Sequence, residues 1–580
     1  MPLLIDGLII LLYFVLITSI GLYMGRREKS LHDFALGGRR VPWWAVMASI
    51  IAAETSAATF LGTPGEGYNN RAFWYVQLII GLIIGRVLVG YVFLRPYYTY
   101  KVYTVYDYLG VRFGPLSKNY VSALFLFMRT LASGTRMFVP AIVMVLAWKL
   151  YAGGGRTVGY QQANSVAPYA VAIIIITVLT CLYTTVGGIK AVIWTDVIQA
   201  AIMFGSALLA VATLLHHIGG GNVADGFRAL ARELPQLKTF NGYFQTGFEP
   251  SVIDRYKAAN HVAALGPWDY ARLVLVEPYT LFSAVVGSMF LNMAAFGTDQ
   301  DMVQRMLTAE TYRKARRSLI TAAVMDLPVA AAFTFIGILL FVYYRQDPTY
   351  KPVANADVFG SYILNVMPLG VRGLVLAGVF ATAMGSLSAA LNALATSATN
   401  DWYIPYLAPG RAEHHYVNAA RAFTAVFAAL MILIAAAFAY AIVKDPTVRI
   451  IPVVLGIAGF ILGPMLGVFL LGMLTRRRGS DAGNVIAISA GLVTTVVLGG
   501  VHVDLANLVA GPGTYRVPPW LPKIAFTWFA LIGSVVVVVI GILFPTPPHV
   551  LAAARLRAEE AQTSEDKPLA LRERPTSPAR

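Results

Sequence analysis

The chain is 580 residues long; hydrophobic residues make up 57% of it and charged residues only 13%. This balance excludes a set of soluble domains and is typical of a protein that crosses a membrane several times. The formal net charge of +16 does not indicate nucleic acid as a partner, because the Lys and Arg residues lie in short loops between apolar segments.

About thirteen apolar segments long enough to cross a bilayer as helices follow one another along the chain. Their limits, uncertain by a few residues, are 3–24, 43–62, 73–96, 119–149, 167–186, 194–216, 272–297, 317–344, 371–396, 420–443, 450–474, 483–502 and 524–545. A bilayer admits only helices and closed barrels, and alternating strand patterns are absent. We therefore predict an all-α integral membrane domain over residues 1–548.

The short loops predict the orientation of the chain. Threading the segments alternately collects basic residues on one side, namely Arg26, Arg27, Lys29, Arg39, Arg40, Arg95, Lys101, Arg112, Lys118, Arg305, Arg313, Lys314, Arg316, Arg317, Arg476, Arg477 and Arg478. This side is expected to be cytoplasmic, with the N-terminus outside and the C-terminus inside. We expect a multi-pass protein of the cell inner (plasma) membrane.

Two polar regions lie outside the predicted spans. Residues 217–271 form the one long polar loop, which is expected outside the cell, with a helix near 223–234. Residues 549–580 are charged and rich in Pro, Ser and Thr. They contain too few apolar residues for a core, so we expect a largely disordered cytoplasmic tail, unstructured beyond Glu560.

The second segment is interrupted by polar residues from Ala52 to Thr59. A break in a membrane helix frees backbone carbonyls that can bind an ion, and Ala52 and Thr55 are placed to do so. An ionisable residue inside a membrane is a candidate functional group by default. Glu54 therefore has two interpretations, contact with an ion or solute and a structural pairing with a buried donor.

Charged residues also occur in later segments. Arg129 and Arg136 are seven residues apart and share one helix face, where they need carboxylates, water or an anionic solute as partners. Asp326 is a candidate partner, and a buried ion pair or snorkelling to the interface is the alternative. Asp196, at the start of the sixth segment, either favours the helix dipole or lines an inner ion exit.

Two further patterns point to a site between helices. Thr382 and Ser386 are four residues apart in the ninth segment, so their hydroxyls share a face and are candidates to complete an ion shell; the alternative is that small residues here allow close packing. The seventh segment is interrupted near 292–297, at a place comparable to the break in the second. Paired interruptions indicate the binding site of a transporter with inverted repeats, here 43–216 and 272–474.

Five motifs in order carry a resemblance to a known family. They are Gly37-Gly38-Arg39 with Pro42-Trp43-Trp44, Thr104-Val105-Tyr106-Asp107-Tyr108-Leu109 with Arg112-Phe113, Gly187-Gly188 to Thr195-Asp196, Thr298 to Arg305, and Gly463 to Gly472. The chain resembles the sodium:solute symporter family over roughly residues 5–545. The resemblance implies two inverted five-helix repeats, similar to the leucine-transporter fold, with helices 3–24, 483–502 and 524–545 outside the repeats.

The resemblance also implies a set of sodium ligands. The main site maps onto Ala52, Thr55 and Thr382, with the hydroxyl of Ser386. The chain departs from the family pattern at Gly385, where many relatives carry a hydroxyl residue. A possible second sodium path maps onto Asp196 and Ser388, but the next position is Ala389.

Substrate residues carried over by the resemblance are Thr59, Gln77 and Asn292. The aromatic residue with which sugar carriers close over their substrate is replaced by Ala295. With Arg129 and Arg136 present, this favours a carboxylate or other anionic solute over a neutral sugar or polyol.

The predicted function is sodium-coupled import of a small polar solute by a single chain in a lipid bilayer. No covalent chemistry and no cofactor other than the coupling ion are expected. The alternatives are a sodium/sugar or polyol symporter and a proton-coupled carrier that uses Glu54 or Asp196. A transporter-like sensor is disfavoured, because the segment after Pro548 is too short for a signalling domain.

Overall fold

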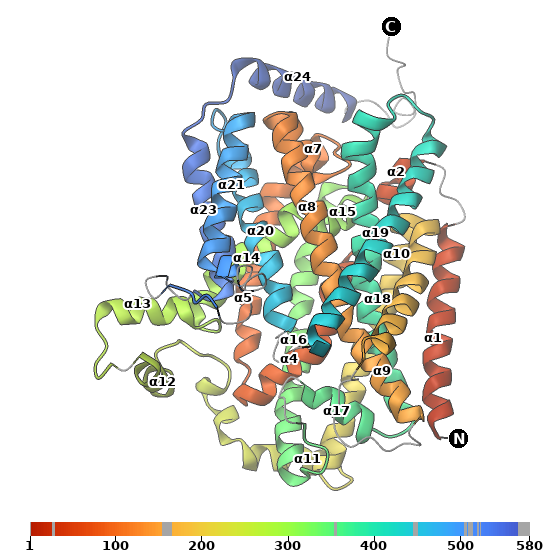
Figure 1. Cartoon of the computed structure of the whole chain (residues 1–580), viewed down its shortest axis with the longest axis vertical. Helices are drawn as coiled ribbons and strands as arrows, with labels where there is room; N and C mark the ends of the chain where they lie inside the picture. Colours follow the sequence, from red (N-terminus) through yellow and green to blue (C-terminus); the bar gives the residue numbers. More distant parts are fainter. Residues whose placement is uncertain are drawn as a thin grey trace.

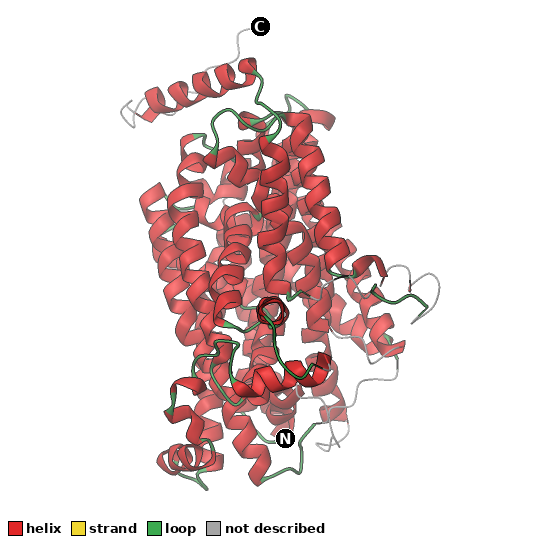
Figure 2. Ribbon diagram, turned by 90° about the vertical axis from the view of Figure 1, so that its left-hand side faces the viewer, coloured by secondary structure: helices red, strands yellow, loops and turns green. Residues whose placement is uncertain are grey.

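The protein is a bundle of helices that run roughly along one direction, as the computed structural model shows (Figures 1 and 2). It describes residues 2–25, 30–152, 165–260, 262–352, 357–444, 450–503, 507, 514–518, 521 and 524–565. The first helix, α1 (Pro2–Met24), begins at one end of the bundle, and the last, α24 (Pro548–Glu565), lies across the other end. These are called the α1 end and the α24 end below.

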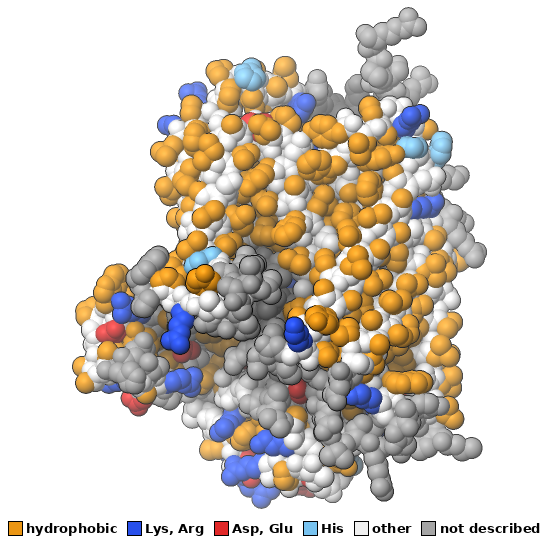
Figure 3. All heavy atoms as spheres, viewed as in Figure 1, with side chains coloured by type: hydrophobic (Ala, Val, Ile, Leu, Met, Phe, Trp, Pro, Cys, Tyr) orange, Lys and Arg blue, Asp and Glu red, His pale blue; other side chains and the backbone are white. Residues whose placement is uncertain are grey.

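Eight helices in the described residues are long and apolar enough to cross a membrane, or nine if a bent pair is counted as one span. They include α1, α10 (Ala167–Ile218), α16 (Tyr312–Gln346), α18 (Val371–Ser397), α19 (Glu413–Lys444) and α21 (Asp481–Leu498). Apolar side chains cover the middle of the bundle, and most Lys and Arg side chains in view lie nearer its ends (Figure 3). The protein is therefore a multi-pass membrane protein.

The count of eight or nine differs from the predicted thirteen because several predicted spans are joined, bent or short. The predicted spans 167–186 and 194–216 are the two halves of α10, which breaks at Gly188 with φ 51° and ψ −153°. A side chain at Gly188 would meet the Phe34 carbonyl oxygen at 2.6 Å. Only glycine therefore suits this turn. Two further apolar helices, Ser283–Thr298 and Phe526–Ile542, are shorter than 18 residues, and of a third helix, Ile450–Leu474, the apolar stretch Gly459–Leu474 has 16 residues.

The second predicted span is broken as expected. Helix α3 (Trp43–Glu54) is followed after two residues by α4 (Ala57–Asn70), and the pair is bent by 67°. In the last hydrogen bond of α3 the Thr55 N–H donates to the Ile51 carbonyl, and the Ser56 side chain caps α4 by accepting from the Thr59 N–H. The break frees the carbonyl of Ala52 from the helix ladder.

The break in the seventh predicted span lies later than expected. Helix α14 (Ser288–Thr298) runs through the predicted interruption at 292–297, and the chain breaks at Asp299 before α15 (Gln300–Leu307). Asp299 has an extended backbone, and its carboxylate accepts the Asp301 N–H at the start of α15. An N-cap aspartate thus sets the break, rather than the small residues before it.

Around these breaks the remaining helices form a scaffold. They include α5 (Leu78–Leu88), which continues through a π-helical turn into α6 (Leu94–Thr99), and α8 (Pro115–Arg136), which is followed by α9 (Phe138–Ala152). Helices α20 (Ile450–Leu474) and α23 (Phe529–Ile542) pack against each other and against α21. At the α1 end, Asp6 accepts from Arg372 at the start of α18 and so ties α1 to the bundle.

The long polar loop contains α11 (Val223–Glu233), where a helix was predicted, and also α12 (Pro250–Asn260) and α13 (Pro267–Val276). Helix α13 projects sideways from the bundle (Figure 1). Beyond the membrane domain, α24 continues to Glu565, five residues past the point at which disorder was predicted to begin. Residues 566–580 of the predicted tail lie outside the described residues.

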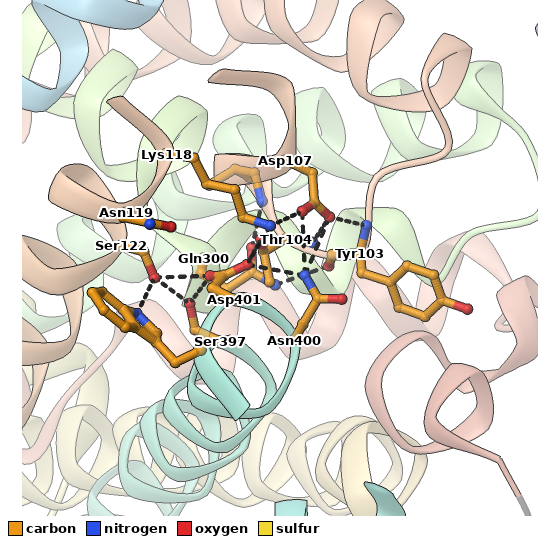
Figure 4. A network of polar contacts seen from close by, with 12 residues as sticks. Tyr103, Thr104, Asp107, Lys118, Asn119, Ser122, Gln300, Ser397, Asn400 and Asp401 are labelled. Atoms are coloured by element: carbon orange, nitrogen blue, oxygen red, sulfur yellow. Dashed lines mark hydrogen bonds and ion pairs between the residues drawn. The ribbon is translucent and has the colours of Figure 1, made fainter. Parts of the chain in front are cut away.

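A buried polar network at the α24 end joins α7 (Val105–Arg112), α8 and the π-helical end of α18 (Ala398–Leu407), as Figure 4 shows. Lys118 contacts Asp107 at 2.7 Å and Asp401 at 3.4 Å. Asp107 also accepts from the backbone N–H groups of Tyr103 and Thr104, and Asp401 from the hydroxyls of Thr104, Ser122 and Ser397. One ammonium group therefore bridges carboxylates from two different elements.

Candidate functional site

The residues predicted to bind sodium meet where α18 crosses the broken end of α3. The Ser386 hydroxyl donates to the Ala53 carbonyl at 3.1 Å. A Cβ attached to Gly385, one residue earlier, would lie 3.5 Å from the Ala52 carbonyl oxygen. Thr55 ends α3 and is buried. The structure therefore brings Ala52, Thr55 and Ser386 together.

The other predicted hydroxyls bond to their own helix. Thr382 donates to the Val379 carbonyl at 2.8 Å, and Ser388 donates to the Gly385 carbonyl at 3.1 Å. Both residues are almost fully buried on α18. They lie close to the ion residues along the helix, but each hydroxyl proton already has a backbone acceptor.

Asp196 reaches the same place from α10 and is fully buried. Its Oδ2 accepts from the Ser49 hydroxyl at 2.5 Å and from the Arg305 guanidinium at 3.3 Å. Arg305, which the sequence analysis placed in a cytoplasmic loop, is in fact fully buried in α15 and also pairs with Asp301. An arginine that binds two carboxylates inside the bundle carries no information on loop topology.

Arg129 and Arg136 have different surroundings. Arg129 forms ion pairs with Asp299 and with Asp301, so its charge is already matched. Arg136, the last residue of α8, is partly buried and forms no ion pair or hydrogen bond with any described residue. Carbonyls at a helix C-terminus stabilise a cation only weakly. Arg136 is therefore a guanidinium with unused donors near the middle of the bundle.

Arg136 lines a cavity of about 20 Å³ together with residues of the broken helix and of α18. The lining residues are Ser56, Ala57, Ser133, Arg136, Met137, Ala383, Ser386 and Leu387. This volume holds about one water molecule. The bundle is therefore closed around the cavity in this conformation, and a larger solute requires the helices to separate.

The sequence analysis suggested Asp326 as a partner of Arg129 and Arg136, but Asp326 pairs with neither of them. It pairs with Arg86 of α5 at 2.8 Å, and Arg86 also forms an ion pair with Glu54. The Arg86 guanidinium lies 3.8 Å from the centre of the Phe296 ring. Sequence reasoning missed Arg86, although an arginine inside the predicted span 73–96 was itself a signal.

The predicted substrate residues are not all gathered at the cavity. Gln77 is buried and bonds to the backbone of Gln245 and Tyr279, in and just after the long loop. The amide of Asn292 donates to the Ser288 carbonyl and hydroxyl on its own helix, and Thr59 lies one turn beyond Ser56 on α4. Of the predicted substrate residues, only Arg136 lines the cavity.

A broken apolar helix whose end lies beside buried charges, inside a bundle of apolar helices, is typical of a membrane transporter. Residues 34–491 match the profile of the sodium:solute symporter family. The chain belongs to this family, and it is a transporter, not an enzyme.

The chain is 26% identical over 560 residues to the sodium/sialic acid symporter SiaT of Proteus mirabilis, covering 96% of this chain and 97% of that protein. It is 26% identical over 517 residues to the sodium/glucose cotransporter of Vibrio parahaemolyticus, covering 84% of each chain. A solved structure of a sodium-coupled sialic acid symporter, substrate-bound and outward-open, matches with a TM-score of 0.70 at 24% identity, covering 93% of this chain and 97% of that one. This match shows the fold, an all-helical fold similar to the leucine transporter's.

Proposed function

We propose that the protein couples sodium entry to the import of a small organic anion whose carboxylate binds Arg136. The observation that carries this proposal is the unpaired Arg136 guanidinium in the central cavity, beside the hydroxyls of Ser56, Ser133 and Ser386. An unpaired charge inside a membrane protein is costly, and a carboxylate that forms two parallel bonds to a guanidinium removes that cost. The pairing of Arg129 with Asp299 and Asp301 leaves Arg136 as the proposed anchor.

The coupling ion binds, in this proposal, between the free carbonyls at the end of α3 and the facing side of α18. Ala52, Thr55, Thr382 and Ser386 supply oxygens from two helices, so the ion fixes the position of α3 relative to α18. An ion and a solute that favour the same closed arrangement tighten each other's binding by the same factor. Two relatives are named sodium/sialic acid symporters, so their names give sodium and an organic acid as the transported pair. This agrees with the proposed pairing of a cation and an anion.

The direct test is uptake into proteoliposomes that contain the full-length protein. Labelled sialic acid, pyruvate, glucose and proline are offered under an inward sodium gradient, under an equal potassium gradient, and under a proton gradient without sodium. We expect uptake of a carboxylate that requires the sodium gradient. Uptake that depends on the proton gradient alone would show that the coupling ion is a proton and not sodium. Sodium-driven uptake of glucose alone would show that the substrate is a neutral sugar and not an anion.

Arg136→Gln is expected to lower the affinity for the transported anion by about a hundredfold, because a buried hydrogen-bonded charge pair contributes about 3 kcal/mol. The affinity for sodium alone should change little. Binding is measured by thermal stabilisation of the purified variant against solute and against sodium. Arg228→Gln, at a residue whose side chain is 74% exposed, is the control. Unchanged anion affinity in Arg136→Gln would show that the anion binds elsewhere.

A further inference from the structure

A groove of about 400 Å³ follows the outside of the bundle between the first half of α10 and α19. It extends along residues 177–186 of α10, which is about 14 Å at the rise of an α-helix. Small side chains line most of it, and those on α10 stand four residues apart, so they share one face. These residues are Thr177, Cys181 and Thr185 of α10 and Ala425, Ala428 and Ala429 of α19.

The groove opens toward the bilayer. Val178 and Leu182, which also line it, are 54% and 48% exposed, and Leu433 beside it on α19 is 65% exposed. Large apolar side chains that are exposed along a membrane-spanning helix face hydrocarbon rather than water. A molecule that occupies the groove is therefore apolar over most of its length.

Thr177 indicates that a molecule from outside the protein fills the groove. This lining residue is 0% exposed, and its hydroxyl forms no hydrogen bond with any described residue. By contrast, Thr180 and Thr184 on the same helix each donate to the carbonyl four residues earlier. Because buried hydroxyls are nearly always bonded, an unpaired one in the wall of a groove points to a ligand that contacts it.

A cation stands at one end of the groove. Arg421 lies one turn before Ala425 on α19, and its Nη2 donates to the carbonyl of Val186, which lines the groove, at 3.5 Å. Its Nε is buried without a hydrogen-bond partner, and the guanidinium forms no ion pair with any described residue. A guanidinium with unused donors binds phosphate oxygens through two parallel hydrogen bonds.

The order of groups along the groove matches a phospholipid. Arg421 is near the start of α19, which follows the π-helical end of α18 at the α24 end of the bundle. Next comes Thr185, whose hydroxyl shares a hydrogen bond of 3.4 Å with the Cys181 thiol. When the thiol donates this bond, the hydroxyl proton is available to an ester oxygen. The basic loops assign the α24 end to the cytoplasm, and the cytoplasmic leaflet is rich in anionic lipids.

A second copy of the protein fits the groove less well than a lipid. A helix about 10 Å across fills about 1,100 Å³ over the same length, whereas the groove holds about 400 Å³. A symmetric pair of copies joined here would also bring two Arg421 guanidiniums to the same depth in the membrane without an anion between them. A hydrocarbon chain is slender enough for the groove, and its phosphate supplies the missing anion.

We propose that this groove binds one anionic phospholipid, with its phosphate on Arg421 and one acyl chain along Thr185, Cys181 and Thr177. The lipid fills the space between α10 and α19, so it stabilises the packing of these two helices and raises the stability of the protein by mass action. None of the groove residues lines the cavity that contains Arg136. The proposal therefore goes beyond the proposed function and does not depend on which solute is carried.

The first experiment counts the lipids that the full-length protein retains in native mass spectrometry, during a titration in detergent. Phosphatidylglycerol is compared with phosphatidylcholine of the same acyl chains, and we expect one phosphatidylglycerol to bind ahead of any other lipid. Arg421→Gln should raise its apparent Kd about tenfold or more, through the loss of a charge-assisted hydrogen bond, and should change phosphatidylcholine binding little. Arg411→Gln, at an exposed arginine near the start of α19, is the control for general attraction between charges.

The second experiment fills the groove. Ala429→Phe introduces a ring from an exposed lining position and should weaken the retention of both lipids. Ala437→Phe, at an exposed residue of the same helix that does not line the groove, is the matched control and should retain lipid as the wild type does. If Ala429→Phe is not recovered folded, Ala425→Leu fills part of the groove from a second exposed position.

Cys181 reports on the groove directly, because it is the only cysteine of the chain. A bound acyl chain covers the thiol, so alkylation by N-ethylmaleimide should be several times slower in phosphatidylglycerol than in phosphatidylcholine. Arg421→Gln should abolish this difference. Equal alkylation rates of the wild type in the two lipids would contradict the proposed place of the acyl chain.

Two further outcomes would overturn the proposal. If wild type, Arg421→Gln and Ala429→Phe retain phosphatidylglycerol with the same apparent Kd, the lipid binds elsewhere on the protein. If oxidation joins two copies through Cys181, and Ala429→Phe separates the pair without changing lipid retention, the groove is an interface between copies of the chain.

Discussion

Replacing Arg86 with methionine is expected to destabilise the protein by about 3–5 kcal/mol, because it leaves the carboxylates of Glu54 and Asp326 without their shared cation. Arg86 is fully buried in α5 and holds both carboxylates, one from the end of α3 and one from α16. Its guanidinium also lies against the Phe296 ring of α14. A single side chain thus ties four helices near the break.

The rescue variant tests this explanation. Arg86→Met/Glu54→Gln/Asp326→Asn removes all three charges and should regain most of the lost stability, since neutral groups cost far less to bury than unpaired ions. The melting temperature and the fraction of monodisperse protein are measured in one detergent. Arg228→Met, at an exposed loop residue, is the control. A stability of Arg86→Met within about 0.5 kcal/mol of wild type would mean that water or lipid already solvates these carboxylates.

Gly337→Ala is expected to destabilise the protein by about 3 kcal/mol, the upper part of the usual range for overpacking. A Cβ at Gly337 of α16 would lie 1.9 Å from the Pro64 carbonyl oxygen, and a Cβ at Gly67 of α4 would lie 2.1 Å from the Thr334 carbonyl oxygen. The two backbones are therefore in reciprocal contact, and neither can give way by a side-chain rotation. Small residues allow this approach between membrane helices.

The matched control for this variant is Gly205→Ala in α10, where a Cβ would meet nothing within 4 Å. Alanine favours a helix over glycine, so this variant should be neutral or slightly stabilising. The melting temperature of Gly337→Ala should therefore fall, and that of Gly205→Ala should stay the same or rise slightly. Because Ser56, the N-cap residue of α4, lines the central cavity, Gly337→Ala should also impair solute binding. A Gly337→Ala protein as stable as wild type would show that α4 and α16 separate easily.

The fold was largely predictable from the sequence, because long apolar segments predict membrane helices and polar interruptions predict breaks in them. The α3 break at Ala52 to Ser56 was predicted from its polar interruption, and the facing residue Ser386 from its spacing of four residues after Thr382 and from the family resemblance. The second break was misplaced, since small residues at 292–297 look permissive, whereas the N-cap at Asp299 ends the helix. Local composition shows where a helix is weak, but a cap decides where it stops.

The sequence could not predict which buried charged side chains form ion pairs with one another. Arg129, Arg136 and Asp326 were each recognised as unusual, but their pairing depends on how α5, α8, α15 and α16 lie in space.

The polar network at the α24 end has a consequence for how the protein moves. Lys118 bridges Asp107 of α7 and Asp401 at the end of α18 with a single ammonium group. If α7 separates from α18, the fully buried Asp401 loses the ammonium group that lies 3.4 Å away, whereas the partly exposed Asp107 and Lys118 stay in contact with solvent. Separation at this end therefore leaves Asp401 buried without its cation, so the network favours the closed arrangement of α7, α8 and the end of α18.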